Sequence, residues 1–222
     1  MKQSINQLLV HLDATAHGKE RLDVARLIAQ GQGAAVCALY AVTPSLLALP
    51  FAGEAGASAA AMLQEVDEDR RRAARAVFES VAATEGPRVA WAETQDLPVI
   101  ASFTHQALYA DLLVLGQYDI SDPAFAGVPP DFVESVLAQS GKPAVVVPYA
   151  GVPAAMGDTV VIAWKATRET ARAVAAAVPL LQRARRVYVL SWGGEAPEVH
   201  GDSLSLKRYL KQIGRASCRE RV

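Results

Sequence analysis

Residues 110–148 of the chain read ADLLVLGQYDISDPAFAGVPPDFVESVLAQSGKPAVVVP. Two short, uninterrupted apolar runs, 112–115 and 144–147, lie near the ends of this segment and are bordered by glycine or proline. Such runs are typical of strands that are buried on both faces of a parallel sheet. The residues between them supply a loop and a helix over about 131–139, which is the long crossover that parallel neighbours need. We therefore predict two parallel strands of one sheet, with a functional loop at the carboxyl end of the first.

The same alternation of apolar runs and helical periodicity extends toward the N-terminus. Three further strands are predicted at 7–12, 35–42 and 89–93. Helices are predicted at about 19–30, 59–84 and 98–108, and residues 45–58 are predicted to be a loop with at most a short helical turn. This alternation indicates an α/β fold with an open, doubly wound, five-stranded parallel sheet of the Rossmann-like kind, for which the simplest strand order is 3-2-1-4-5.

Apolar spacing also predicts which faces of the helices are buried. In the first helix the buried stripe is expected to hold Leu22, Ala25, Ile28 and Ala29, and to leave out Glu20, Arg21 and Arg26. In the long helix the buried side is expected to hold Met62, Val66, Ala73, Val77 and Val81. The charge run 67–72 is expected to be a solvated face with the ion pairs Asp67–Arg71 and Glu68–Arg72. Asp96 is the expected N-cap of the next helix.

A second copy of the pattern begins near residue 159. Strands are predicted at 159–164 and 186–191, and helices at 167–183 and 203–212. LVHLDAT (9–15) and VIAWKAT (161–167) align at a constant offset, and each precedes a helix and then a strand, which indicates an internal duplication. We expect a complete domain over 1–150, a linker over 151–158, a partial second domain over 159–213, and a vector-derived tail without a strand over 214–222.

Composition narrows the classes of function. The formal net charge is −1, which gives no reason to expect nucleic acid or an anionic membrane surface as a partner. No apolar run approaches the roughly 20 residues that span a bilayer, and the N-terminus has no signal-peptide pattern. The two cysteines, Cys37 and Cys218, indicate neither a disulfide framework nor a metal site. We expect a cytoplasmic protein.

A ligand crevice is predicted between the first and fourth strands, because open α/β sheets bind ligands where the strand order reverses. Asp13 and Gly116 should face each other across it. The candidate cofactor-binding residues are Asp13, Thr15, Gly116 and Gln117. The Asp13 carboxylate has two interpretations: it could contact a ligand, or it could hydrogen-bond the turn that follows it. We favour the second interpretation.

Four motifs carry a resemblance to a known family: LLVHLDAT (8–15), ADLLVLGQYD (110–119), GKPAVVVP (141–148) and VVIAWKATRETARAV (160–174). With this order and spacing, the chain resembles the tandem universal stress proteins. The resemblance implies a sheet like that of the adenine nucleotide alpha hydrolases and a cytoplasmic, stress-associated role. It also implies a homodimer, or a pairing of the two halves, through the fifth strand, Ala144–Val147. In nucleotide-binding relatives, the residue that matches Asp13 contacts adenine, ribose or a metal.

The expected phosphate loop departs from the family pattern. Nucleotide-binding members have Gly-x-x-Gly, nine residues, and then Gly-Ser or Gly-Thr after the fourth strand. Gly116 matches the first glycine, but Asp119 stands at the second, and Pro130–Asp131 stands at the Gly-Ser pair. A phosphate cradle needs free backbone N–H groups and a positive local field, whereas proline has no N–H and Asp119, Asp122 and Asp131 add negative charge. We predict that ATP binds weakly or not at all.

The leading hypothesis is a non-enzymatic stress-response module with a degenerate nucleotide loop and, at most, a small-molecule ligand in the crevice. The alternative is an ATP-binding universal stress protein that hydrolyses ATP slowly. A receiver domain shares the alternating pattern, but the third strand ends in Glu93–Thr94 and the first strand has no acidic pair. No metal ligand set, catalytic residue or enzymatic activity is predicted, because His105 has no ligating partner at i+4 and no serine lies in a nucleophile elbow.

Overall fold

The computed structural model describes residues 4–48, 56–94, 97–122, 127–151, 156–191, 204–214 and 218–221. The chain divides into two compact units, Ile5–Val152 and Pro153–Val222, the second of which also includes Met1–Ser4. Each unit carries its own parallel sheet. Within the described residues, no helix combines the length and the apolar character needed to cross a bilayer.

The Ile5–Val152 unit contains five parallel strands in the order β3-β2-β1-β4-β5, which confirms the predicted fold class. The strands are β1 (Gln7–Leu12), β2 (Ala35–Tyr40), β3 (Val89–Glu93), β4 (Leu112–Gly116) and β5 (Ala144–Val147). The helices are α1 (Gly18–Gln32), α2 (Ser45–Ala48), α3 (Ala57–Ala82), α4 (Val99–Ala107) and α5 (Phe132–Ser140). In the register, Leu8 of β1 lies opposite both Val36 of β2 and Leu112 of β4.

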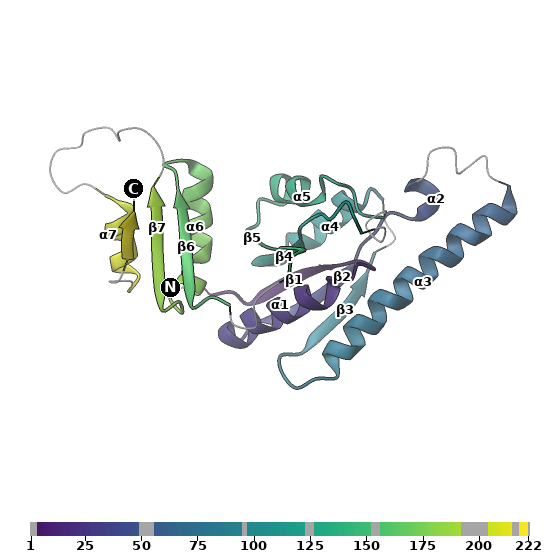
Figure 1. Cartoon of the computed structure of the whole chain (residues 1–222), viewed down its shortest axis with the longest axis horizontal. Helices are drawn as coiled ribbons and strands as arrows, with labels where there is room; N and C mark the ends of the chain where they lie inside the picture. Colours follow the sequence, from purple (N-terminus) through teal and green to yellow (C-terminus); the bar gives the residue numbers. More distant parts are fainter. Residues whose placement is uncertain are drawn as a thin grey trace. The chain divides into compact units, whose positions relative to one another are not determined.

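Helices cover both faces of this sheet. Figure 1 shows α1 and α3 on one side of the strands and α4 and α5 on the other. On the α4 and α5 side, Leu9 of β1 and Leu113 of β4 join a core with Phe103 and Phe132. Because side chains alternate along a strand, Leu8 and Val10 point to the α1 side. Both faces are therefore buried, which is why β1 and β4 are uninterrupted apolar runs.

The predicted stripe of α1 is wrong at two arginines, because Arg21 and Arg26 are both buried. Arg21 reaches the Asp13 carboxylate. Arg26 donates to the backbone carbonyls of Val81 and Thr84 at the end of α3. A helix that packs against both a sheet and a second helix buries a wide face, so long charged side chains on that face stay buried only where they find partners.

The predicted buried side of α3 is wrong at Met62, Val66 and Ala73, which are all exposed. Met62 is 66% exposed, whereas the buried residues are Ala74, Phe78 and Val81. The Phe78 ring packs against Trp91 of β3 at 5.3 Å between centroids. Packing against the sheet therefore begins only in the second half of the helix, and a large aromatic ring sets which side faces inward.

The charge run of α3 pairs at i,i+3 spacing and not at the predicted i,i+4 spacing. The pairs are Asp67–Arg70, Glu68–Arg71 and Asp69–Arg72. Part of the run is also not a solvated face, because Asp67 accepts hydrogen bonds from the backbone N–H of Ser45 at 2.9 Å and from its hydroxyl at 2.6 Å. Asp67 thereby links α3 to the first residue of α2 by two hydrogen bonds.

The start of α4 differs from the prediction. Its N-cap position is held by Pro98, with no side-chain hydrogen bond to the first turn. The predicted cap, Asp96, lies outside the described residues.

The Pro153–Val222 unit contains β6 (Thr159–Trp164), α6 (Arg168–Leu181), β7 (Arg186–Ser191), α7 (Leu206–Gln212) and β8 (Cys218–Arg221). Its strands are parallel in the order β6-β7-β8. The expectation that residues 214–222 contain no strand is therefore wrong, because Cys218–Arg221 form β8. Pairing with the open edge of β7 requires only backbone N–H and C=O groups, so apolar periodicity could not reveal it.

Candidate functional site

The predicted crevice lies at the carboxyl ends of β1 and β4, which are neighbours in the sheet. Asp13 and Thr15 follow β1 and are both buried. Gly116 ends β4 and is half-buried, and Gln117 next to it has an exposed side chain. The backbone N–H of Gln117 donates to the carbonyl of Val147 at 2.8 Å, so its main chain belongs to the pairing with β5. The four candidate residues thus all lie at the carboxyl ends of β1 and β4, but only Asp13 and Thr15 contact each other there.

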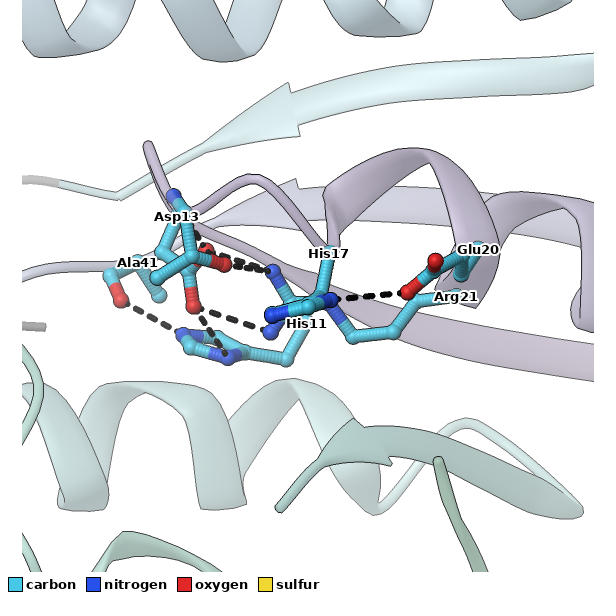
Figure 2. A network of polar contacts seen from close by, with 7 residues as sticks. His11, Asp13, His17, Glu20, Arg21 and Ala41 are labelled. Carbon is cyan, nitrogen blue, oxygen red and sulfur yellow. Dashed lines mark hydrogen bonds and ion pairs between the residues drawn. The ribbon is translucent and has the colours of Figure 1, made fainter. Parts of the chain in front are cut away.

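The Asp13 carboxylate is bound on both oxygens by groups of the protein itself. Arg21 of α1 donates from Nη1 to Oδ2 at 2.9 Å and from Nη2 to Oδ1 at 2.5 Å. Oδ1 also accepts the Thr15 backbone N–H at 2.9 Å and the Thr15 hydroxyl at 2.5 Å. Figure 2 shows the Arg21 side chain reaching from its helix to this carboxylate. The hydrogen bonds from the Thr15 turn to Asp13, which the favoured interpretation predicted, are present. The buried ion pair between Asp13 and Arg21 was not predicted.

Arg21 also explains why residue 116 is glycine. A Cβ at Gly116 would lie 2.6 Å from Arg21 Nη1, well inside van der Waals contact. The guanidinium therefore lies between Asp13 on one strand end and Gly116 on the other. Arg21 is only 1% exposed, and its Nε has no hydrogen-bond partner. The space that the topology offers to a ligand is occupied by this side chain.

His11 forms the other side of the network. Its Nε2 lies 2.8 Å from the carbonyl oxygen of Ala41, and its Nδ1 lies 3.8 Å from Asp13 Oδ2. The imidazole ring packs against Phe132 at 4.3 Å and edge-on against Phe103 at 5.5 Å between centroids. Figure 2 shows the His11 ring joined by dashed lines to the Ala41 carbonyl and to the Asp13 carboxylate. His17 pairs separately with Glu20 at 2.8 Å, within the first turn of α1.

These positions shift the pKa of both titratable groups. Burial and, to a smaller extent, the Arg21 charge lower the pKa of His11 to about 4, against the raising effects of Asp13 and of the hydrogen bond to Ala41. Burial alone would raise the pKa of Asp13, but the charge and hydrogen bonds of Arg21, aided by His11 and Thr15, hold it well below its ordinary value. At neutral pH the network therefore holds a neutral imidazole beside one buried ion pair.

A loss of stability in mild acid is expected from His11. The unfolded chain takes up a proton near the ordinary pKa of 6.5, but the folded chain does so only near 4, so lowering the pH from about 7.5 to about 5 should cost about 2 kcal/mol of unfolding free energy. Asp13 does not contribute in this window, because the stability from a lowered carboxylate pKa is lost only as the pH falls below the ordinary carboxylate value.

Urea unfolding of the wild type and His11→Gln at both pH values measures this loss. The loss should disappear in His11→Gln and persist in His105→Gln, where the histidine is exposed on α4. An unchanged pH dependence in His11→Gln would show that the acid sensitivity arises elsewhere.

The described residues of the loop after β4 contact neighbouring segments of the chain. Gly127 accepts a hydrogen bond from the backbone N–H of Thr43 at 2.7 Å, and Val128 is buried in the core of α4 and α5. Asp119 accepts hydrogen bonds from the backbone and hydroxyl of Ser121. At the start of α5, Asp131 accepts the hydroxyl of Ser135 at 2.8 Å. The carboxylates of Asp119 and Asp131 therefore both accept hydrogen bonds from neighbours in the chain.

No metal centre accompanies the network in the described ranges, since their histidine, cysteine, aspartate and glutamate side chains nowhere gather in a group of three that could hold an ion. The chemistry available is therefore an ion pair, an imidazole and hydroxyls. Arg21 is the residue that the sequence prediction missed. The signal was present in its spacing, because Arg21 stands four residues before Ala25 and seven before Ile28, which places it on the buried face.

Comparison with solved structures identifies the fold. The universal stress protein UspA from Lactobacillus plantarum is 22% identical, with a TM-score of 0.50, over 65% of this chain and 99% of that protein. A universal stress protein from Archaeoglobus fulgidus DSM 4304 is 11% identical, with a TM-score of 0.60, over 98% of this chain and 76% of that protein. No protein-family model and no curated protein sequence matches the chain. The chain therefore has the fold found in these universal stress proteins.

Proposed function

We propose that the chain is a universal stress protein that acts in the cytoplasm as a non-enzymatic stress-response module, and that its β1–β4 crevice holds no nucleotide. The shared fold and the four sequence motifs support the family. The observation that carries the proposal is the buried guanidinium of Arg21, which lies where a ligand would have to enter.

Nucleotide binding in this crevice would have to displace Arg21. Both oxygens of Asp13 are already used by Arg21 and Thr15, so the carboxylate has little capacity left for a ribose or a metal-bound water. Separating a buried ion pair costs about 3–5 kcal/mol when one charge is left unpaired. Such a cost weakens binding on the order of a hundredfold to several thousandfold. An affinity in the ordinary micromolar range would become millimolar.

The loop adds a second obstacle to polyphosphate. Pro130 has no N–H to donate, and Asp119 and Asp131 place carboxylates at the matching loop positions. The first N–H groups of a helix attract anions, but Asp131 and Glu134 already place negative charge at the start of α5. A triphosphate would therefore meet like charge.

Calorimetric titration of the whole chain with magnesium ATP tests the proposal. We expect no saturable binding below the millimolar range, and no nucleotide released when the purified protein is denatured and examined by mass spectrometry. A micromolar dissociation constant that weakens in Gln117→Ala, an exposed substitution at the crevice mouth, would favour the ATP-binding or slowly hydrolysing alternative. A micromolar constant that Gln117→Ala leaves unchanged would place a nucleotide elsewhere.

The expected partner is a second copy of the chain or its own second unit, through β5. This strand is at the end of the sheet, so one of its edges is unpaired within that sheet, and Val146 is 42% exposed. An apolar edge of this kind pairs with another strand or aggregates. No nucleic acid or membrane partner is proposed, because the net charge is −1.

Sedimentation velocity is expected to show dimers or larger species for the wild type, and a shift toward monomer for Val146→Lys. A charge at the edge opposes strand pairing. Leu27→Lys on α1, at a residue of similar exposure, is the matched control and should leave the distribution unchanged. A wild type that stays monomeric at high concentration would contradict the β5 interface.

A further inference from the structure

A separate cavity of about 370 Å³ opens at the carboxyl end of β3, between that strand and α4. Its described lining shares no residue with the Arg21–Asp13 network. This volume is at the lower end of the range for small-molecule sites in proteins. The cavity could therefore hold a molecule of about the size of a monosaccharide.

Helix α4 forms one wall of the cavity. Phe103 and Ala107 of this helix face the core, whereas Ser102, His105 and Gln106 line the cavity. Residues at i, i+3 and i+4 lie on one side of a helix, so these three polar side chains face the space together. The His105 ring also lies edge-on to Tyr109, at 5.9 Å between centroids.

The opposite wall is the end of β3, and a hydrogen bond joins it to α4. The hydroxyl oxygens of Thr94 and Ser102 lie 2.6 Å apart. The backbone N–H of Thr94 donates to the carbonyl of Tyr40 at 3.1 Å, which continues the strand pairing to this residue. Leu39 and Ala92 supply an apolar floor. The cavity thus has fixed walls and a mixed lining, as ligand sites do.

The charges of the lining favour one class of ligand. The described lining residues include Glu93 but neither lysine nor arginine. The Glu93 carboxylate lies 3.8 Å from Arg71 of α3, which covers the face of the sheet opposite α4, so the polar groups that face the cavity are those of Thr94, Ser102, His105 and Gln106. Hydroxyl, imidazole and amide groups match hydroxyl groups of a ligand. An anion would find no cation among the described lining residues to replace its hydration.

We propose that this cavity binds a small, neutral, polyhydroxylated molecule of monosaccharide size. Ser102, Thr94, His105 and Gln106 contact its hydroxyl groups, and Leu39 contacts its apolar face. The cavity shares no described residue with the crevice at Arg21, so the outcome of the ATP titration neither supports nor contradicts sugar binding here.

Amide-resolved NMR titration of the whole chain with glucose and glucose 6-phosphate tests the proposal. Glucose should cause saturable shifts at Thr94, Ser102 and His105 with a millimolar dissociation constant. Glucose 6-phosphate should cause no saturable shift at these residues.

Two variants decide the outcome. Ser102→Leu fills the cavity and should weaken glucose at least about tenfold, whereas Ser80→Leu, at an exposed serine of α3, should bind as the wild type does. Gln106→Ala removes an exposed amide from the lining and should weaken glucose about threefold or more, which keeps the proposal testable if Ser102→Leu does not fold. Absence of shifts in the wild type, equal binding of glucose 6-phosphate, or unchanged binding in Gln106→Ala would overturn the proposal.

Discussion

Arg21→Ala is expected to lower the free energy of unfolding by about 3–5 kcal/mol, because it leaves the Asp13 carboxylate buried without its counter-ion. The guanidinium makes two hydrogen bonds to Asp13 and one to Thr15, and it is 1% exposed, so water cannot replace it without a rearrangement of α1. Urea unfolding at neutral pH measures the loss. Lys19→Ala, which removes an exposed ion pair with Asp23 in the same helix, should change stability by less than about 0.5 kcal/mol.

A double variant separates the ion pair from simple loss of packing. Arg21→Met keeps much of the volume, and Asp13→Asn keeps an oxygen for the Thr15 backbone N–H. The two changes together should cost about 1–3 kcal/mol less than the sum of the single changes, because each single change leaves an unpaired buried charge and the double variant leaves none. Strict additivity, or an Arg21→Ala loss no larger than that of Lys19→Ala, would contradict a buried, coupled pair.

Phe103→Ala is expected to cost about 3–5 kcal/mol, the range for removal of a fully buried aromatic ring. Phe103 is 0% exposed and lies in the core between α4, α5 and the sheet. Its ring contacts His11 and, at 5.3 Å between centroids, Phe132. The loss combines the transfer of apolar surface back to water with the cavity that remains.

Chemical unfolding of Phe103→Ala should be compared with that of Leu108→Ala, at the residue that follows α4. Leu108 is 51% exposed, so its truncation should change the unfolding free energy by about 0.5 kcal/mol or less. The His11 ring packs on Phe103, so Phe103→Ala should also reduce the loss of stability between neutral and mildly acidic pH. Equal costs for the two variants would mean that α4 packs with another face inward.

The elements of the Ile5–Val152 unit were predictable because each leaves a local pattern. Buried parallel strands appear as apolar runs, helices as apolar stripes, and turns as glycine and proline. Strands such as 112–115 and 144–147, and the helix between them, lie within two residues of their predicted ends. The strand order follows because crossovers of this length and hand allow few arrangements.

Several of the errors have a common cause, since they concern contacts with segments that are distant in the sequence. Met62 has the spacing of a buried residue, but it precedes the part of α3 that packs against the sheet. Asp67 belongs to a charged run, but it binds Ser45 of α2. Strand β8 lacks apolar periodicity, but the edge of β7 pairs with its backbone.

The amino-acid sequence by itself determined the five-stranded parallel layer, the helices that cover it and the place where the strand order reverses, because hydrophobic periodicity and chain connectivity are local properties. Only the tertiary structure decided what occupies that place. Arg21 is eight residues from Asp13 along the chain and 95 residues from Gly116, and its guanidinium lies between them only because α1 packs across both strand ends. A charged side chain remains buried only where the fold brings its counter-ion to it, and sequence spacing does not encode that encounter.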